Sequence, residues 1–303
     1  MELKKIKGNT FYIKGGTNTG VYIFDDNKAL IIDPGLAGSR PKRIINMLEE
    51  KNIKVNFIIN THEHDDHYGA CNQFKEYYND ICILSSDEAK LYIEKPYLFG
   101  KYIMGGKYNR FFVDKLKNKS LDEIKVDKIA KEGSLLLNNE EFEIIDLKGH
   151  TDGSIGILTK DKVLFTGDLL IGLDMLKKYD FLFLYDIKKE IDSIMKLKEI
   201  DFDYLVLGHS KEVISKKDSK FITEMHLNAI DKYLNKVRED LNVPITLEEL
   251  LKKIIIDNNL KCNYKEYHFF KSSLVSMISY LADLDEIDYI LNDGELLYCT
   301  KKK

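Results

Sequence analysis

Histidine and acidic side chains are concentrated in one short segment of the chain. The segment reads Thr61-His-Glu-His-Asp-Asp-His67, which places His62, His64, Asp66 and His67 in the pattern H-x-H-x-D-H. Two histidines at positions i and i+2 of an extended loop can reach one metal ion from the same side, while Asp66 and His67 turn toward a second ion. The spacing therefore predicts a metal site rather than a solvated polar loop.

Three further candidate ligands lie at the ends of later predicted strands. They are His150 in Lys148-Gly-His-Thr-Asp-Gly-Ser154, Asp168 in Phe165-Thr-Gly-Asp168 and His209 in Leu207-Gly-His-Ser210. Two divalent ions held by imidazoles and carboxylates lower the pKa of a bridging water toward neutrality. The resulting hydroxide attacks an electrophilic carbon or phosphorus, so the pattern predicts hydrolytic chemistry.

The elements that must position these residues are strands that end in loops. Apolar residues suit strands over 11–14, 21–24 and 29–32, a helical pattern begins at Pro41, and a buried strand over 55–60 runs into the histidine motif. A second β-rich stretch covers about residues 135–167, followed by a helix over about 187–199 and a strand over 204–207. This alternation predicts two α/β halves that face each other through their sheets, with helices outside.

Residues 1–240 resemble the metallo-β-lactamase superfamily of hydrolases, because five of the seven histidines occupy motif positions in the family's order. The resemblance implies a four-layer α/β/β/α sandwich with the site along one edge of the two sheets. It also implies that His62, His64 and His150 hold a first metal ion, that Asp66, His67 and His209 hold a second, and that Asp168 bridges both. Asp66 would orient the hydroxide or pass its proton to the leaving group.

The types of the seven candidate ligands, and the residues next to them, limit which metal ions and which branch of the family are expected. All seven ligands offer nitrogen or oxygen, which suits zinc best and also accommodates manganese or iron. Asp152 stands where the family usually has proline, and Ser210 where it usually has glycine, so no subfamily's substrate can be transferred. His64 argues against the branch that carries glutamate there and performs redox chemistry on two irons. Glu63 and Asp65 are expected to support the site from outside or to lie on the surface.

Residues 95–120 interrupt the α/β pattern with a basic and aromatic insertion. Seven basic residues and one acid give the insertion a net charge of +6. A cap of this composition suits an anionic substrate, and the candidate substrate contacts are Lys101, Lys107, Tyr108 and Arg110. An amphipathic flap with its rings against the core and its lysines in water explains the same composition equally well. Lys177 and Tyr179, which follow Asp168, are further substrate candidates.

Residues 241–303 form a separate predicted unit. Two amphipathic helices precede two strands around Asn292-Asp-Gly294, a strong hairpin signal, so the unit resembles a winged-helix module. It contains eight lysines, no arginine and ten acids, a net charge of −2. A DNA-reading face needs a basic stripe, so a packing or dimerisation role is favoured.

Composition limits the remaining possibilities. The chain has 303 residues, a net charge of −4 and four cysteines without a C-x-x-C pair, and it lacks a membrane span or secretory signal. These features predict a cytoplasmic protein that does not coat nucleic acid or membrane. His226, on a predicted helix, is expected at the surface.

The leading functional hypothesis is a hydrolase with two divalent metal ions that cleaves an ester-like bond, a thioester or a lactone, in a small anionic substrate. The basic insertion and residues 241–303, which we call the tail, also fit a phosphodiesterase or ribonuclease of the same fold. A hypothesis of another class is a metal-binding regulatory protein without turnover, which the complete ligand set disfavours.

Overall fold

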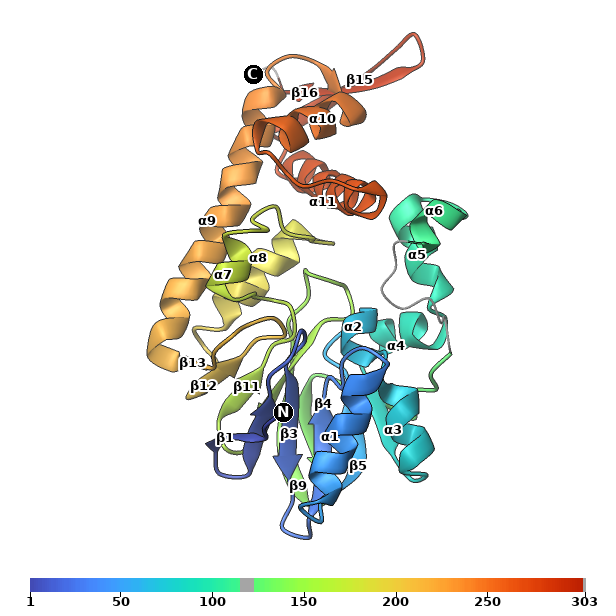
Figure 1. The fold of residues 1–303 in the computed structure, drawn as a ribbon. Helices are drawn as coiled ribbons and strands as arrows, with labels where there is room; N and C mark the ends of the chain where they lie inside the picture. The colour runs from blue at the N-terminus through green and yellow to red at the C-terminus, as the bar shows by residue number, and fades with distance from the viewer. Residues whose placement is uncertain (115–122, 302–303) are drawn as a thin grey trace.

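The computed structural model describes residues 1–114 and 123–301 (Figure 1). Within them a seven-stranded sheet is built in chain order, and its strands pair antiparallel as far as β4 and parallel from there on. Its strands are β1 (Lys4–Lys7), β2 (Thr10–Ile13), β3 (Thr19–Ile23), β4 (Lys28–Ile32), β5 (Lys54–Ile59), β6 (Cys82–Ser85) and β7 (Lys128–Ile129).

A six-stranded sheet faces the first, in the order β13-β12-β11-β10-β9-β8. Among its described strands, only β11 and β12 pair in parallel, so they end at the same edge. Its strands are β8 (Gly133–Leu137), β9 (Glu140–Asp146), β10 (Ile155–Thr159), β11 (Val163–Phe165), β12 (Tyr204–Val206) and β13 (Ile214–Ser215).

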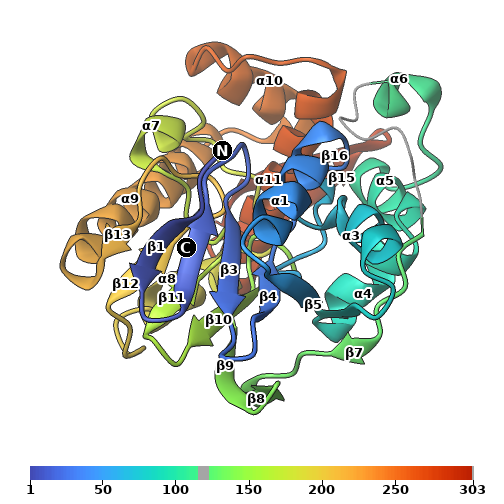
Figure 2. The same cartoon turned by 60° about the horizontal axis from the view of Figure 1, so that its bottom comes forward.

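Three packed interfaces join the layers (Figure 2). On β4, Ala29 and Ile31 pack toward α1 (Ser39–Glu49) and α3 (Cys71–Tyr77), whereas Leu30 and Ile32 pack between the two sheets. This alternation follows from the period of two of a strand. The second sheet is covered in turn by α8 (Ile187–Lys196) and α9 (Lys216–Asp240). The predicted four-layer α/β/β/α sandwich is confirmed.

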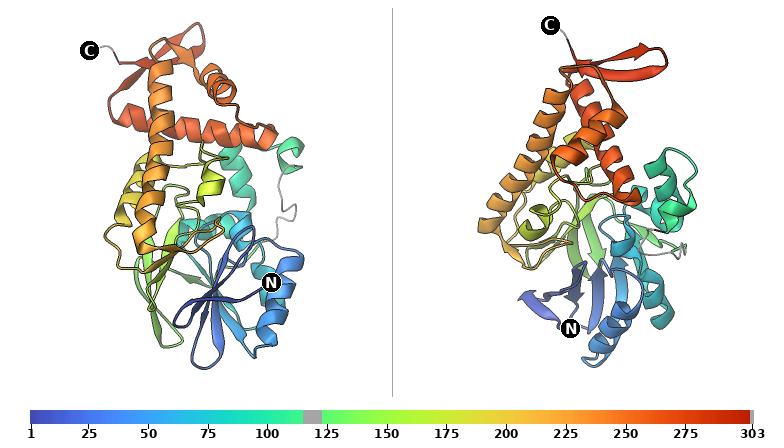
Figure 3. Two further views of the ribbon diagram at one scale, coloured as in Figure 1. Left: turned by 60° about the vertical axis from the view of Figure 1, so that its left-hand side comes forward. Right: turned by 45° about the horizontal axis from the view of Figure 1, so that its top comes forward.

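The tail continues the core of the second half. One apolar cluster runs from the second sheet through α8 and α9 into α10 (Leu247–Asp257) and α11 (Tyr264–Asp283). A small antiparallel sheet in the order β14-β16-β15 completes the tail, with β14 at Ile245–Thr246, β15 at Ile287–Asn292 and β16 at Glu295–Thr300 (Figure 3). Two helices and a terminal hairpin are present as expected; the winged-helix assignment and the boundary near residue 240 remain predictions.

Shorter helices occupy the loops around the site edge. They are α2 (Asp65–Tyr68), α4 (Asp87–Glu94), α5 (Tyr97–Met104), α6 (Arg110–Val113) and α7 (Leu173–Leu176). The insertion predicted over 95–120 corresponds to α5 and α6 as far as residue 114, and its last six residues lie outside the described part. Among the described residues, none of the helices combines the length and apolar character needed to cross a bilayer.

Candidate metal centre

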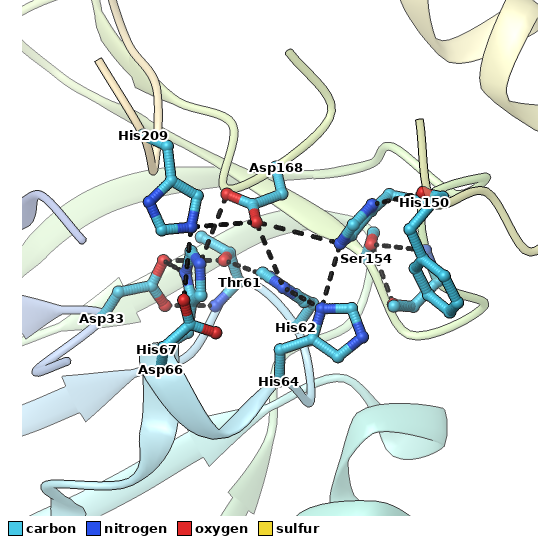
Figure 4. Close-up of polar contacts among 12 residues, drawn as sticks. Asp33, Thr61, His62, His64, Asp66, His67, His150, Ser154, Asp168 and His209 are labelled. Atoms are coloured by element: carbon cyan, nitrogen blue, oxygen red, sulfur yellow. Dashed lines mark hydrogen bonds and ion pairs between the residues drawn. The ribbon is translucent and has the colours of Figure 1, made fainter. Parts of the chain in front are cut away.

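The seven predicted ligands converge where strands of both sheets end. β5 runs into the segment that carries His62 and His64, and the one-turn helix α2 then carries Asp66 and His67. His150 lies in the connection between β9 and β10. Asp168 follows β11 and His209 follows its parallel partner β12, so the two loops lie side by side. Figure 4 shows these side chains pointing toward one another.

Three imidazoles and one carboxylate make the first group of ligand atoms. Nδ1 of His64 lies 3.0 Å from Nε2 of His62 and 3.0 Å from Nε2 of His150. Oδ2 of Asp168 lies 4.0 Å from Nε2 of His62 and 3.8 Å from Nε2 of His150. These atoms are mutually within 4.8 Å, as a shared ion requires.

Asp66, His67 and His209 make the second group. Nε2 of His209 lies 3.3 Å from Oδ2 of Asp66 and 3.3 Å from Oδ2 of Asp168. The other carboxylate oxygen of Asp168, Oδ1, lies 3.3 Å from Nε2 of His67. Asp168 therefore stands between the two groups, at the position that the sequence resemblance assigned to a bridging ligand.

The donor set fits divalent metal ions. Tetrahedral Zn–N bonds of about 2.0–2.1 Å place ligand nitrogens ~3.3 Å apart, close to the 3.0 Å separations around His64. Nε2 of His67 and Oδ1 of Asp168 are buried and, apart from their 3.3 Å ion-pair contact with each other, make no hydrogen bond among the described residues. Buried polar atoms are normally satisfied, and a cation between these groups would satisfy them.

Asp33 supports the centre from outside and was missed by the sequence analysis. Its carboxylate accepts hydrogen bonds from the Thr61 backbone N–H at 2.8 Å and the Thr61 hydroxyl at 2.7 Å, and it lies 2.8 Å from Nδ1 of His67. Nδ1 of His62 lies 3.0 Å from the same Thr61 hydroxyl. Asp33 has a positive φ of 53°, which aspartate tolerates better than most residues. The feature that could have indicated Asp33 is its position directly after β4, the strand that pairs with β5.

Backbone carbonyls orient two more imidazoles. Nδ1 of His150 lies 3.0 Å from the carbonyl oxygen of Phe183, and Nδ1 of His209 lies 2.5 Å from that of Gly16. Nδ1–H donation to these oxygens would leave Nε2 of each ring available to hold a metal ion. Glu63 is buried and accepts from the Thr151 hydroxyl at 2.9 Å, so it steadies the loop that carries His150, as expected for a supporting residue.

Charge and burial divide the imidazoles into two classes. Burial lowers the pKa of His64 to about 3 and also lowers the pKa of His62 and His150, so these rings are neutral and ready to bind metal. The Asp168 carboxylate raises the pKa of His209 to about 10. Burial alone would lower the pKa of His67, but the charges of Asp168 and Asp33 raise it.

Two pockets border the candidate metal ligands, and we name them for their linings. The aromatic pocket, of about 510 Å³, borders His150 and Asp168 and is walled by Phe181, Phe183, Phe269 and Phe270. The polar pocket, of about 630 Å³, borders Asp66 and His209 and is lined by Lys14, Arg40, Asp174, Lys211, Lys265 and Glu266. Residues of α11 therefore line both pockets.

The predicted substrate residues fall into two sets. Lys177 and Tyr179 line the aromatic pocket, and Tyr179 also lines the polar one. The other set lies on or between α5 and α6 and consists of Lys101, Lys107, Tyr108 and Arg110. None of these four is among the residues that line the two pockets. The ammonium of Lys101 instead lies 4.7 Å from the centre of the Tyr97 ring, and the guanidinium of Arg110 lies 5.1 Å from that of the Phe111 ring. Phe99, in the described part of this insertion, does contact a candidate ligand, with its ring centroid 5.3 Å from that of His64. A substrate role for the four remains a prediction.

The expected surface position of His226 is wrong. The side chain is 1% exposed, with Nδ1 2.8 Å from the Ile222 carbonyl oxygen, and Nε2 accepts from the Ile171 backbone N–H at 2.9 Å. The face of α9 that carries His226 packs on the segment after Asp168, a contact that helical periodicity alone does not reveal. Burial lowers the pKa of this imidazole to about 4.

Comparisons with known proteins agree with this geometry. The family model described as Metallo-beta-lactamase superfamily matches residues 13–209. The hydroxyacylglutathione hydrolase GloC of Haemophilus influenzae is 34% identical over 152 residues, which span 49% of this chain and 64% of that protein. A hydroxyacylglutathione hydrolase of Pelagibacter ubique is 27% identical over 271 residues, 86% of this chain and 90% of its own length.

Among solved structures, a beta-lactamase domain protein from Burkholderia ambifaria matches with a TM-score of 0.74 at 13% identity, covering 99% of this chain and 94% of its own. A metallo-beta-lactamase family protein from Thermus thermophilus matches with a TM-score of 0.68 at 17% identity, covering 94% of each chain. These likenesses establish a shared fold.

Proposed function

Because the chain belongs to the metallo-beta-lactamase superfamily, we propose that it is a metal-dependent hydrolase that cleaves a thioester in a small anionic substrate. The observation that carries the proposal is the convergence of all seven candidate ligands, with Asp168 in the first group and its carboxylate 3.3 Å from both His67 and His209 of the second. A protein that had lost turnover would be expected to have lost a ligand. We expect two zinc ions, with manganese or iron as functional substitutes.

The choice of a thioester rests on the relatives. The Haemophilus influenzae and Pelagibacter ubique proteins are named for hydrolysis of hydroxyacylglutathione, a thioester. Such a reaction needs a nucleophile from water at neutral pH and polarisation of the carbonyl, and bound divalent ions supply both. Asp66, beside His209, is placed to accept or return a proton during the exchange.

An anionic substrate is supported by the polar pocket. The guanidinium of Arg40 donates to the carbonyl oxygens of Ile13 at 3.0 Å and Pro34 at 3.4 Å, so it is held in place by neutral acceptors. Of the acids that share this pocket, Asp174 is paired with Lys211 at 2.8 Å. With that pair set aside, Lys14, Arg40 and Lys265 share the pocket with Asp66 and Glu266, and these three cations are the ones proposed to face the anionic group.

A substrate panel tests the proposal. Metal-loaded protein is assayed against S-lactoylglutathione, a lactone, bis-p-nitrophenyl phosphate and single-stranded RNA, with His64→Ala as the inactive control. We expect thioester cleavage to have the highest kcat/KM and to be lost in the variant. Faster cleavage of RNA, with a steep salt dependence, would instead establish the phosphodiesterase alternative. Turnover of none of the four with zinc, manganese or iron would refute the hydrolase.

A further inference from the structure

The tail reaches the metal ligands through an aromatic contact. The ring of Phe269, on α11, lies 5.1 Å from the ring of Phe183 and 5.9 Å from that of Phe99, measured between centroids. Phe183 in turn lies 5.7 Å from His150, and both Phe99 and Phe183 lie within 5.5 Å of His64. Three rings from three separate parts of the chain thus meet beside His64 and His150.

Hydrogen bonds hold this wall in place. The Ser273 hydroxyl of α11 accepts from the Leu184 backbone N–H at 3.2 Å, and the Ser276 hydroxyl donates to the Tyr185 carbonyl at 2.7 Å. The carbonyl of Phe183 faces Nδ1 of His150 at 3.0 Å. The segment 183–185 is therefore tied both to the candidate ligand His150 and to the tail. The left-hand view of Figure 3 shows α11 lying across the top of the catalytic part of the molecule.

The aromatic pocket opens between this segment and the tail. Its volume of about 510 Å³ lies within the range of roughly 300–1,000 Å³ found for small-molecule sites. Leu182 lines it from the catalytic side and Leu260 from the tail, beside the four phenylalanines. Glu190 also lines it, fully buried, and neither of its carboxyl oxygens has a hydrogen-bond partner among the described residues. Apolar walls with a few polar groups, next to candidate metal ligands, are typical of a small-molecule site.

We propose that this pocket binds a bulky apolar group of the substrate, larger than a methyl and attached next to the scissile bond, with the tail forming one wall. The inference rests on the proposed thioester hydrolysis and specifies the substrate class. An apolar group is favoured because burying it against four rings is worth far more than placing a small polar group there. The acyl side and the thiol side of a thioester are both able to supply such a group.

Two substrate series distinguish these sources. One varies the acyl group from acetyl to hexanoyl and phenylacetyl on N-acetylcysteamine, and the other varies the thiol from small to aromatic with a constant acetyl group. We expect kcat/KM to rise by at least about 10-fold along one series. Leu182→Trp and Leu260→Trp fill the pocket from opposite walls, and each should reduce that rise by about 10-fold. Leu291→Trp, on the exposed β15, is the matched control and should preserve it.

Binding of sodium octanoate, measured by calorimetry with acetate as reference, tests the pocket without turnover. We expect octanoate to bind at least about 10-fold more tightly than acetate and the two pocket variants to lose that preference. Preferential octanoate binding without thioester turnover would support the apolar pocket and overturn the proposed reaction. If kcat/KM rises along neither substrate series and octanoate and acetate bind equally tightly, the proposed role of the pocket is overturned, even if thioesters are hydrolysed.

Discussion

Nδ1 of His67 lies 2.8 Å from Oδ2 of Asp33, and the opposite ring nitrogen, Nε2, lies 3.3 Å from Oδ1 of Asp168. The imidazole therefore connects a supporting carboxylate to Asp168, which stands between the two candidate ligand groups. Such outer carboxylates fix the orientation of a ligating imidazole and increase its basicity.

Asp33→Asn tests this support. Asparagine keeps the shape of the side chain and tolerates the positive φ at this position, but it removes the negative charge. We expect the affinity for zinc, measured by competition with a chelator, to fall by about 10- to 100-fold. Asp26→Asn, at an exposed aspartate paired with Lys28 at 2.6 Å, is the matched control. An unchanged affinity in Asp33→Asn would show that the contact is not needed.

Gly208 provides a test of how closely the Asp168 carboxylate is held. A Cβ at Gly208 would lie 2.2 Å from Oδ1 of Asp168 and 2.7 Å from Cε1 of His67, so alanine must displace these groups. We expect Gly208→Ala to lower kcat/KM by about 100-fold, because ligand misplacement of this size is costly. Gly106→Ala serves as control, since a Cβ there meets nothing within 4 Å. Equal activity of the two variants would contradict the arrangement around Asp168.

The buried His226 predicts a pH dependence of stability. Its pKa of about 4 is below its ordinary value of 6.5, so the unfolded chain takes up the proton more readily. The contribution of the neutral His226 side chain to the free energy of unfolding is therefore fully present above pH 6.5. It is lost as the pH falls toward 4, by up to about 3 kcal/mol. Urea unfolding of metal-free wild type and His226→Gln, near pH 7.5 and again about three units lower, measures it. The stability advantage of the wild type should shrink at the lower pH; an advantage that stays constant would rule out this effect.

The fold and the convergence of the seven candidate ligands were predictable because their sequence signals are local. The candidate ligands lie in loops and in a one-turn helix that follow strands with a clear apolar pattern, and such connections are where sites are commonly built. The burial of His226 and the meeting of Phe99, Phe183 and Phe269 were not predictable. These contacts join segments far apart in the chain, and neither helical periodicity nor charge indicates which helix faces a partner.

Asp33 stands between these two cases. It follows a buried strand and precedes Pro34 and Gly35, so its position at the site edge was available from the sequence. An isolated aspartate in a turn has a common structural explanation, however, and its link to His67 depends on the parallel pairing of β4 with β5. Only the sheet register brings the two side chains together.

Metal titration of chelated protein tests the central claim most directly. Zinc is added in steps to the metal-free protein, and thiol release from a thioester is followed together with the bound metal. The two ligand groups predict that activity is absent without metal and reaches its plateau near two ions per chain. Thioester hydrolysis that persists in the metal-free protein, or protein that binds two ions and releases no thiol, would contradict the account.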